Sequence, residues 1–168
     1  HKGRNFHPMN LRDKLKENTI LLPIQASTQS EAIQELLVHL QSIDKLSATS
    51  KLYAAITEKE ETLPSAAGRG IAYPHFTSME IDELVCVLGI SKEGLEFNAP
   101  DGQLCHLILL TLSPNEDPCE HRKFITRFRI MFENPEVRFG LLEANHTSEI
   151  MNIIQNWEDD EAKTDDLS

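Results

Sequence analysis

Two nearly continuous apolar runs constrain the fold of this chain more than any other feature of its sequence. They cover residues 84–90 and 104–112 and contain almost no polar residues. Runs of this length without polar alternation are typical of β-strands that are covered on both faces. The two runs therefore predict a central sheet with helices on both sides, which is an α/β fold.

Helical periodicity supplies the elements that would cover such a sheet. Thr28-x-x-Glu31 is a capping-box pattern, and the apolar spacing after it predicts a helix over residues 28–44. A second helix is expected from Ser47 or Thr49 toward Lys59, a third from Pro118 until Pro135 stops it, and a last one over residues 148–157. A length of 168 residues with 40% hydrophobic content predicts one globular domain.

Net charge and hydropathy exclude two classes of partner. The formal net charge is −11, whereas binding along nucleic acid depends on clustered Lys and Arg that release counterions, so we expect no nucleic-acid partner. The longest unbroken apolar run is far shorter than the roughly 20 residues of a spanning helix, so we expect no membrane insertion. Three cysteines without a Cys-x-x-Cys pair favour a reducing, cytoplasmic location.

Composition divides the chain into a domain with two appendages. Residues 1–8 have charges and no apolar core, and we interpret them as a vector-derived or disordered leader before Met9. The domain is expected over residues 9–157. Residues 158–168 hold six acidic residues against Lys163, and we expect this acidic tail to stay solvated.

A glycine-containing segment leads into the first candidate catalytic residue. Gly68-x-Gly70 lacks the third glycine of a dinucleotide motif, since Tyr73 stands there, and it also lacks the Gly-Lys-Ser/Thr of a nucleotide-hydrolase loop. A tight turn into a short strand is the simplest interpretation of the glycines. Pro74 then delivers His75 at the end of that strand. A neutral imidazole there keeps one lone pair and can act as a nucleophile.

Other histidines in the chain have simpler structural interpretations. His39 lies at the edge of the first expected helix, and His106 lies in an apolar strand, where a hydrogen-bonded structural histidine is expected. Cys119 and His121 together with His75 would supply zinc ligands, but the usual paired spacing of a structural site is absent. We therefore expect no metal.

Three segments resemble one known family. Residues 68–75, Gly-Arg-Gly-Ile-Ala-Tyr-Pro-His, resemble the G-x-G-I-A-x-P-H signature of enzyme IIA domains of the bacterial phosphoenolpyruvate phosphotransferase system, in the fructose–mannitol and nitrogen-regulatory class. Residues 90–102 are similar to the family's G-I-D-F-x-A-x-D-x stretch, and His121-Arg122-Lys123-Phe124 stands where the family has His-Leu and a helix. The resemblance covers about residues 15–155.

The resemblance implies a single α/β domain with a mixed sheet and a set of site residues. His75 would accept a phosphoryl group from a histidine-containing phosphocarrier protein, and His121 would be the second active-site histidine. Residues expected to bind or support the phosphoryl group are Lys59, Ser65 and the backbone N–H groups of the segment from Gly68 to Gly70. No metal or nucleotide cofactor is required.

At two positions the chain departs from the family pattern. Lys59 stands where many members have Arg in an Arg-Glu pair, and lysine lacks the bidentate fork of the guanidinium group. Phe76 replaces the glycine that commonly follows Pro-His. We expect its ring to narrow the approach to His75 or to offer a partner an apolar contact.

Several roles remain open at this level. We favour a regulatory, nitrogen-regulatory type role, because the chain is a IIA-sized domain without fused IIB, IIC or membrane segments. The alternative is a fructose- or mannitol-type IIA that passes the phosphoryl group to a IIB domain for sugar uptake. A binding module switched only by the charge state of His75, and a Cys–His hydrolase built on Cys119 and His121, are further hypotheses.

Overall fold

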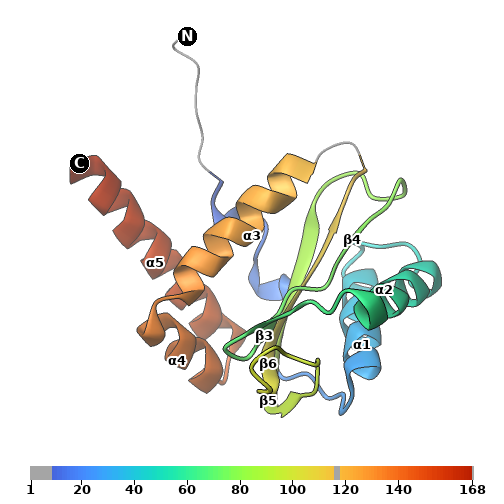
Figure 1. Ribbon diagram of the computed structural model, residues 1–168. Coiled ribbons are helices and arrows are strands. Elements are labelled where there is room, and N and C mark those ends of the chain that lie inside the picture. The colour runs from blue at the N-terminus through green and yellow to red at the C-terminus, as the bar shows by residue number, and fades with distance from the viewer. Residues whose placement is uncertain (1–8, 116–117, 168) are drawn as a thin grey trace.

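The computed structural model describes residues 9–115 and 118–167 and shows a mixed sheet between two layers of helices (Figure 1). The expected leader lies outside the described residues. Strand order in the sheet is β1-β5-β6-β3-β2, and β4 also pairs with β6. β5 and β6 run antiparallel, as do β2 and β3, whereas β1 runs parallel to β5, and β3 and β4 run parallel to β6. The predicted α/β class is confirmed.

The sheet is dominated by two long central strands that correspond to the two apolar runs. Their bounds are Val85–Leu95 for β5 and Cys105–Ser113 for β6. The other strands are short: β1 (Ile20–Leu21), β2 (Ala66–Gly68), β3 (Ile71–Ala72) and β4 (His75–Thr77). Two- and three-residue strands contain too few side chains to show a periodicity, which is why β1, β2 and β4 were not predicted.

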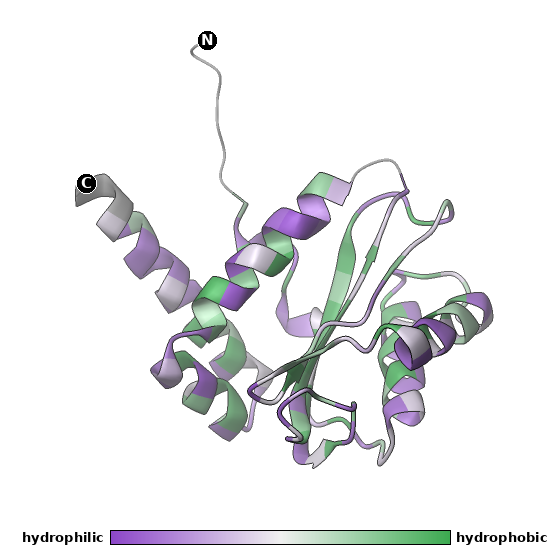
Figure 2. Ribbon diagram, in the orientation of Figure 1, coloured by the Kyte–Doolittle hydropathy of each residue, from purple (hydrophilic) through white to green (hydrophobic). Residues whose placement is uncertain are grey.

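Each face of the sheet is covered by its own set of helices. α1 (Gln29–Ser42) and α2 (Ser50–Thr62) cover one face, and α3 (Pro118–Phe132), α4 (Pro135–Glu143) and α5 (Thr147–Leu167) cover the other. Green apolar faces of these helices turn toward the sheet in Figure 2. Alternate residues of β6 divide between the two cores: Leu107 and Leu109 pack on the α3 side, and Leu110 and Leu112 on the α1 side.

Capping and proline positions explain where the helices begin. Thr28 caps α1 by accepting a hydrogen bond from the Glu31 N–H, as the capping box predicts. Pro135 was expected only to stop a helix. It also starts α4, because proline fits the first helical position and the Asn134 side chain caps the N–H groups there.

The final helix corrects one expectation about the C-terminal residues. α5 continues to Leu167, and Glu158, expected as the first residue of a solvated tail, is only 1% exposed. Its carboxylate accepts hydrogen bonds from the backbone N–H groups of Leu11 and Arg12 and from the Arg127 guanidinium. These donors offset the cost of burying the charge. Glu158 therefore joins α5 to α3 and to the 3-10 turn Leu11–Asp13.

Candidate functional site

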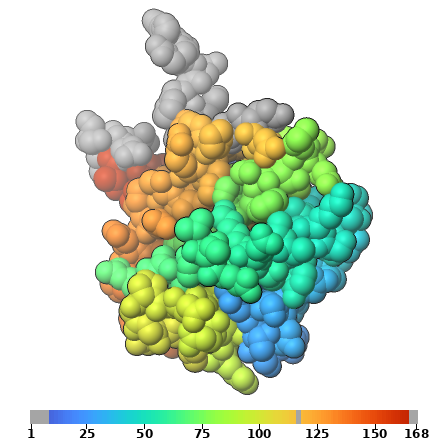
Figure 3. Space-filling view, turned by 45° about the vertical axis from the view of Figure 1, so that its right-hand side comes forward, coloured from blue at the N-terminus to red at the C-terminus, as the bar shows by residue number. Residues whose placement is uncertain are grey.

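Two histidine rings lie face to face between the sheet and α3. His75 is the first residue of β4, and His121 lies in the first turns of α3. The ring centroids are 3.5 Å apart and the ring planes differ by 9°. Figure 3 shows α3, in orange, beside the green surface that follows His75 in the chain. The structure thus brings together the two histidines that were predicted to share a site.

The backbone around His75 is held by hydrogen bonds to β6 and α2. His75 pairs with Thr111 in the β4–β6 register, and the Thr111 N–H donates to the Pro74 carbonyl at 3.0 Å. The Lys59 ammonium donates to the His75 carbonyl at 2.9 Å. His75 was expected at the end of a strand but lies at the start of the next one, because the chain leaves β3 at Tyr73–Pro74 and pairs again from residue 75.

Two β6 hydroxyls that sequence reasoning missed contact the histidine rings. Ser113 Oγ lies 2.8 Å from His75 Nε2, and Thr111 Oγ1 lies 3.0 Å from His121 Nε2. Both side chains are buried. The signal that would have found them is a hydroxyl inside a buried apolar strand, since such a group needs a hydrogen-bond partner.

The surroundings of the two rings favour their neutral forms. Burial lowers the pKa of His75 from its usual 6.5 to about 3, with further contributions from His121 and Lys59. Burial also lowers the pKa of His121 to about 4, with a smaller contribution from Lys59. A neutral imidazole keeps the ring lone pair that nucleophilic attack requires. Both rings are therefore unprotonated at neutral pH.

We predict that neither ring titrates between about pH 5 and pH 8. In the unfolded chain both histidines bind protons below about pH 6.5. In the folded chain His121 binds a proton only near pH 4 and His75 only near pH 3. The stability that these groups contribute is therefore complete above pH 6.5 and is lost as the pH falls toward 3. An NMR titration of the His75 and His121 Cε1–H signals checks this, and an inflection near pH 6.5 would contradict it.

Ser65 lies next to the His75 segment with an unused hydroxyl. Its carbonyl accepts a hydrogen bond from the Tyr73 N–H, and its own N–H donates to the Glu60 carboxylate. Among the described residues, Ser65 Oγ is a buried side-chain oxygen without a hydrogen-bond partner. A buried hydroxyl that lacks a partner gains free energy when a ligand supplies one.

The glycine segment lies away from the histidine pair. Ile71, the residue after Gly70, pairs with Leu107 on β6, whereas His75 pairs with Thr111. Leu107 and Thr111 are four residues apart on that strand. At about 3.3 Å per residue this is a separation of roughly 13 Å. The Arg69 N–H donates to Asp101, and the Gly70 carbonyl accepts from His106 and Leu107. The expected contact of Gly68 and Gly70 with a phosphoryl group at His75 is therefore not supported.

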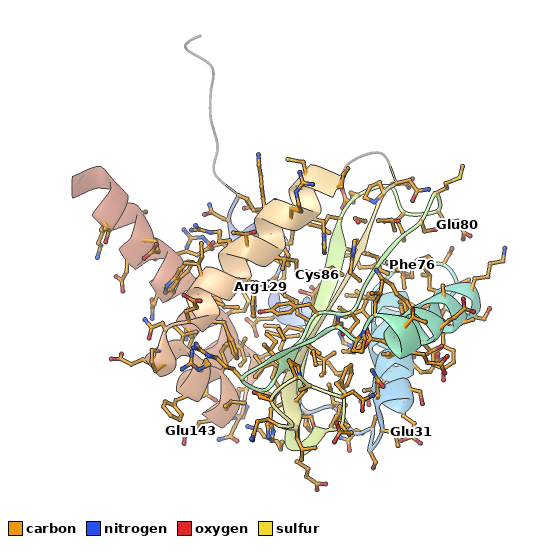
Figure 4. All side chains as sticks on the ribbon, in the orientation of Figure 1. Glu31, Phe76, Glu80, Cys86, Arg129 and Glu143 are labelled. Carbon is orange, nitrogen blue, oxygen red and sulfur yellow. The ribbon has the colours of Figure 1, made fainter. Side chains whose placement is uncertain are left out.

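Phe76 points away from the His75 ring. Successive residues of a strand face opposite sides, so His75 faces α3 and Phe76 faces the core under α1 and α2. Figure 4 shows Phe76 on the α2 side of β4. The expectation that this ring narrows the approach to His75 is wrong for this reason.

The two histidines that were expected to be structural, His39 and His106, contact backbone carbonyls. His39 Nε2 contacts the Asn18 carbonyl at 2.7 Å, and His106 Nδ1 contacts the Ser91 carbonyl at 2.9 Å. In residues 9–115 and 118–164, no three His, Cys, Asp or Glu side chains are grouped to hold a metal ion. No helix in the same residues is both long enough and apolar enough to span a bilayer.

Comparison with known families connects this geometry to a reaction class. The model of the family described as "Phosphoenolpyruvate-dependent sugar phosphotransferase system, EIIA 2" matches residues 13–157, which include the histidine pair, Lys59 and Ser65. The match covers most of the domain and all six strands of the sheet.

Individual relatives come from both branches of this family. The chain is 27% identical to the PTS system fructose-specific EIIABC component of Bacillus subtilis, over 87% of this chain but only 23% of that protein. It is 19% identical to the nitrogen regulatory protein of Bradyrhizobium diazoefficiens, over 87% of this chain and 95% of that protein. The crystal structure of nitrogen regulatory protein IIA-Ntr from Neisseria meningitidis has a TM-score of 0.77 at 20% identity, covering 84% of this chain and 97% of that one.

Proposed function

Because the chain belongs to the phosphotransferase-system EIIA 2 family, whose domains relay a phosphoryl group through a histidine, we propose that His75 is the residue phosphorylated in this chain. The stacked pair of neutral rings, 3.5 Å apart, carries this proposal. The donor would be a phosphohistidine on a histidine-containing phosphocarrier protein. No metal or nucleotide takes part in the proposed step.

The proposed transfer is an in-line displacement at phosphorus. The lone pair of a His75 ring nitrogen forms the new N–P bond while the N–P bond of the donor breaks, and the donor imidazole takes back its electron pair. Negative charge spreads over the three equatorial oxygens in this kind of transition state. The Lys59 ammonium, already bonded to the His75 carbonyl, would lower the electrostatic cost of bringing that charge to the site.

His121 and Ser65 would support the phosphorylated state. A dianionic group on His75 raises the proton affinity of a neighbouring imidazole, so His121 would gain a proton and donate to a phosphoryl oxygen. The buried Ser65 hydroxyl would serve as a further donor, provided that the phosphoryl group reaches it. Together with Lys59, these two residues account for three of the supporting site residues proposed from the sequence.

The phosphorylated histidine can be identified directly. The wild-type chain is incubated with phosphoenolpyruvate and the general phosphotransferase proteins, and acid-labile, base-stable phosphate is mapped by mass spectrometry under neutral conditions. We expect one phosphoryl group, located on His75. Location on His121 or His106 would contradict the site assignment, and modification of Cys119 would favour the hydrolase hypothesis.

For the biological role we propose regulation, in which the phosphorylation state changes the affinity for a protein target. The match over 95% of a nitrogen regulatory protein supports this choice. The higher identity to a fructose-specific component supports the alternative, transfer to a IIB domain during sugar uptake.

The two roles predict different behaviour toward partners. Wild-type and His75→Ala chains, each with and without prior phosphorylation, are used to capture proteins from a lysate of the source organism. A regulator should retain at least one protein in only one phosphorylation state, and the alanine variant should not respond to the phosphorylation step. Fast phosphoryl transfer to a captured IIB domain, with no state-dependent partner, would support sugar uptake instead.

A further inference from the structure

The two hydroxyls of β6 lie on one face of the strand, at the place where the histidine pair packs against it. Thr111 and Ser113 are two residues apart, so their side chains project to the same side. Leu107 and Leu109 continue this face and pack in the apolar core under α3. The side chains on this face of β6 therefore change from leucine to hydroxyl-bearing residues at the point where the strand contacts His75 and His121.

Both hydroxyls are buried, and burying a hydroxyl costs free energy of desolvation that an apolar side chain at the same position would not cost. Thr111 is 0% exposed and Ser113 is 1% exposed. A hydroxyl in such surroundings is unfavourable unless it forms a hydrogen bond. Each of the two contacts a different histidine, Ser113 at His75 Nε2 and Thr111 at His121 Nε2. Each imidazole thus has its own hydroxyl partner.

Backbone contacts and stacking on His121 do not distinguish the two flipped orientations of the His75 ring. The register of β4 on β6 and the Lys59 contact hold the backbone of His75. Rotation of the ring would exchange the positions of its nitrogen and carbon atoms without changing those contacts. A hydrogen bond to Nε2 distinguishes the orientations and also sets which nitrogen of a neutral ring carries the proton.

We propose that Thr111 and Ser113 are positioning residues that orient the two imidazoles, Ser113 for His75 and Thr111 for His121. This inference rests on the proposed phosphorylation of His75 and adds two residues to that site. Neither hydroxyl needs to touch the phosphoryl group. Their effect is to keep the reacting nitrogen aimed at the incoming phosphorus, since small misplacements of a nucleophile lower the rate of transfer.

The test compares variants that remove one hydroxyl while keeping the shape of the strand. Thr111→Val is isosteric, and Ser113→Ala removes one atom from a buried position. We expect Ser113→Ala to slow phosphorylation of His75 roughly tenfold, which is the effect of losing about one hydrogen bond in the transition state. Thr111→Val should mainly slow onward transfer. The conservative variants Ser113→Thr and Thr111→Ser should restore most of each rate.

A second measurement separates orientation from general stability. Ring ¹⁵N chemical shifts of the unphosphorylated protein report the tautomer of each histidine. Ser113→Ala should shift the His75 signals and Thr111→Val those of His121, each leaving the other ring much less affected. Ser91→Ala is the matched control, because Ser91 is buried on β5 and its hydroxyl contacts the Gly94 N–H. It should move neither the rates nor the tautomers.

The outcomes separate this inference from the proposed function. Unchanged ¹⁵N shifts, or unchanged rates despite shifted signals, would overturn the positioning role. A wild-type chain that accepts no phosphoryl group would overturn the proposed function, and with it the transfer part of the inference, while the ¹⁵N shifts would still show whether the hydroxyls orient the rings.

Discussion

Replacing His75 with alanine is expected to abolish phosphorylation of this chain by the phosphoenolpyruvate-dependent proteins, lowering the rate on the order of a thousandfold or more. Alanine has no lone pair with which to form the N–P bond, and His121 is proposed to support the phosphorylated state rather than to accept the phosphoryl group. The measurement is the initial rate of acid-labile phosphate incorporation.

Two further alanine variants show whether the loss is specific to His75. His121→Ala should still accept the phosphoryl group but pass it on more slowly, because His121 is proposed to act on the charge of the phosphorylated state. His146→Ala replaces an exposed histidine ahead of α5 and should behave like wild type. Stoichiometric phosphate on the His75→Ala chain would contradict the assignment, and unchanged circular dichroism would exclude unfolding as the cause of its loss.

Replacing Glu158 with alanine is expected to lower the free energy of unfolding by about 3 kcal/mol. The side chain is fully buried, and its Oε2 atom accepts from the Leu11 N–H at 2.6 Å and from Arg127 Nε at 2.7 Å. Alanine would leave these donors without their acceptor in a region shielded from water. Urea denaturation followed by circular dichroism measures the change.

Asp159 supplies the matched control for Glu158. It is the next residue, and its carboxylate forms an ion pair with Arg12 at 3.0 Å while its side chain is 55% exposed. Solvent screening makes such pairs weak, so Asp159→Ala should cost less than about 1 kcal/mol. Equal losses for the two variants would show that burial of Glu158 does not matter.

Local patterns were sufficient to predict most of the large elements. The capping box at Thr28 and the apolar spacing after it correspond to α1, and the two apolar runs correspond to β5 and β6. Such patterns are reliable because each element must bury its own apolar face, whatever the rest of the chain does. α4 was missed because Pro135 both ends one helical pattern and begins the next.

The candidate site depended on information of a different kind. Sequence reasoning selected His75 as a nucleophile from Pro74 and the glycine run, and the family resemblance added His121, Lys59 and Ser65. The sequence prediction also included Gly68 and Gly70, which precede Ile71, and the sheet register places Ile71 itself roughly 13 Å from His75. Closeness in the sequence was misleading here, because in an extended segment residues only a few positions apart are separated by more than about 10 Å.

The α/β class, the buried strands and the family could be predicted from residue types and from spacing within single segments. Three features required the folded arrangement: Phe76 faces away from His75, Glu158 is buried, and Thr111 and Ser113 contact the two rings. These features are contacts between segments distant in the chain. Their geometry is set by strand register and by the packing of α3 and α5, which no local pattern contains.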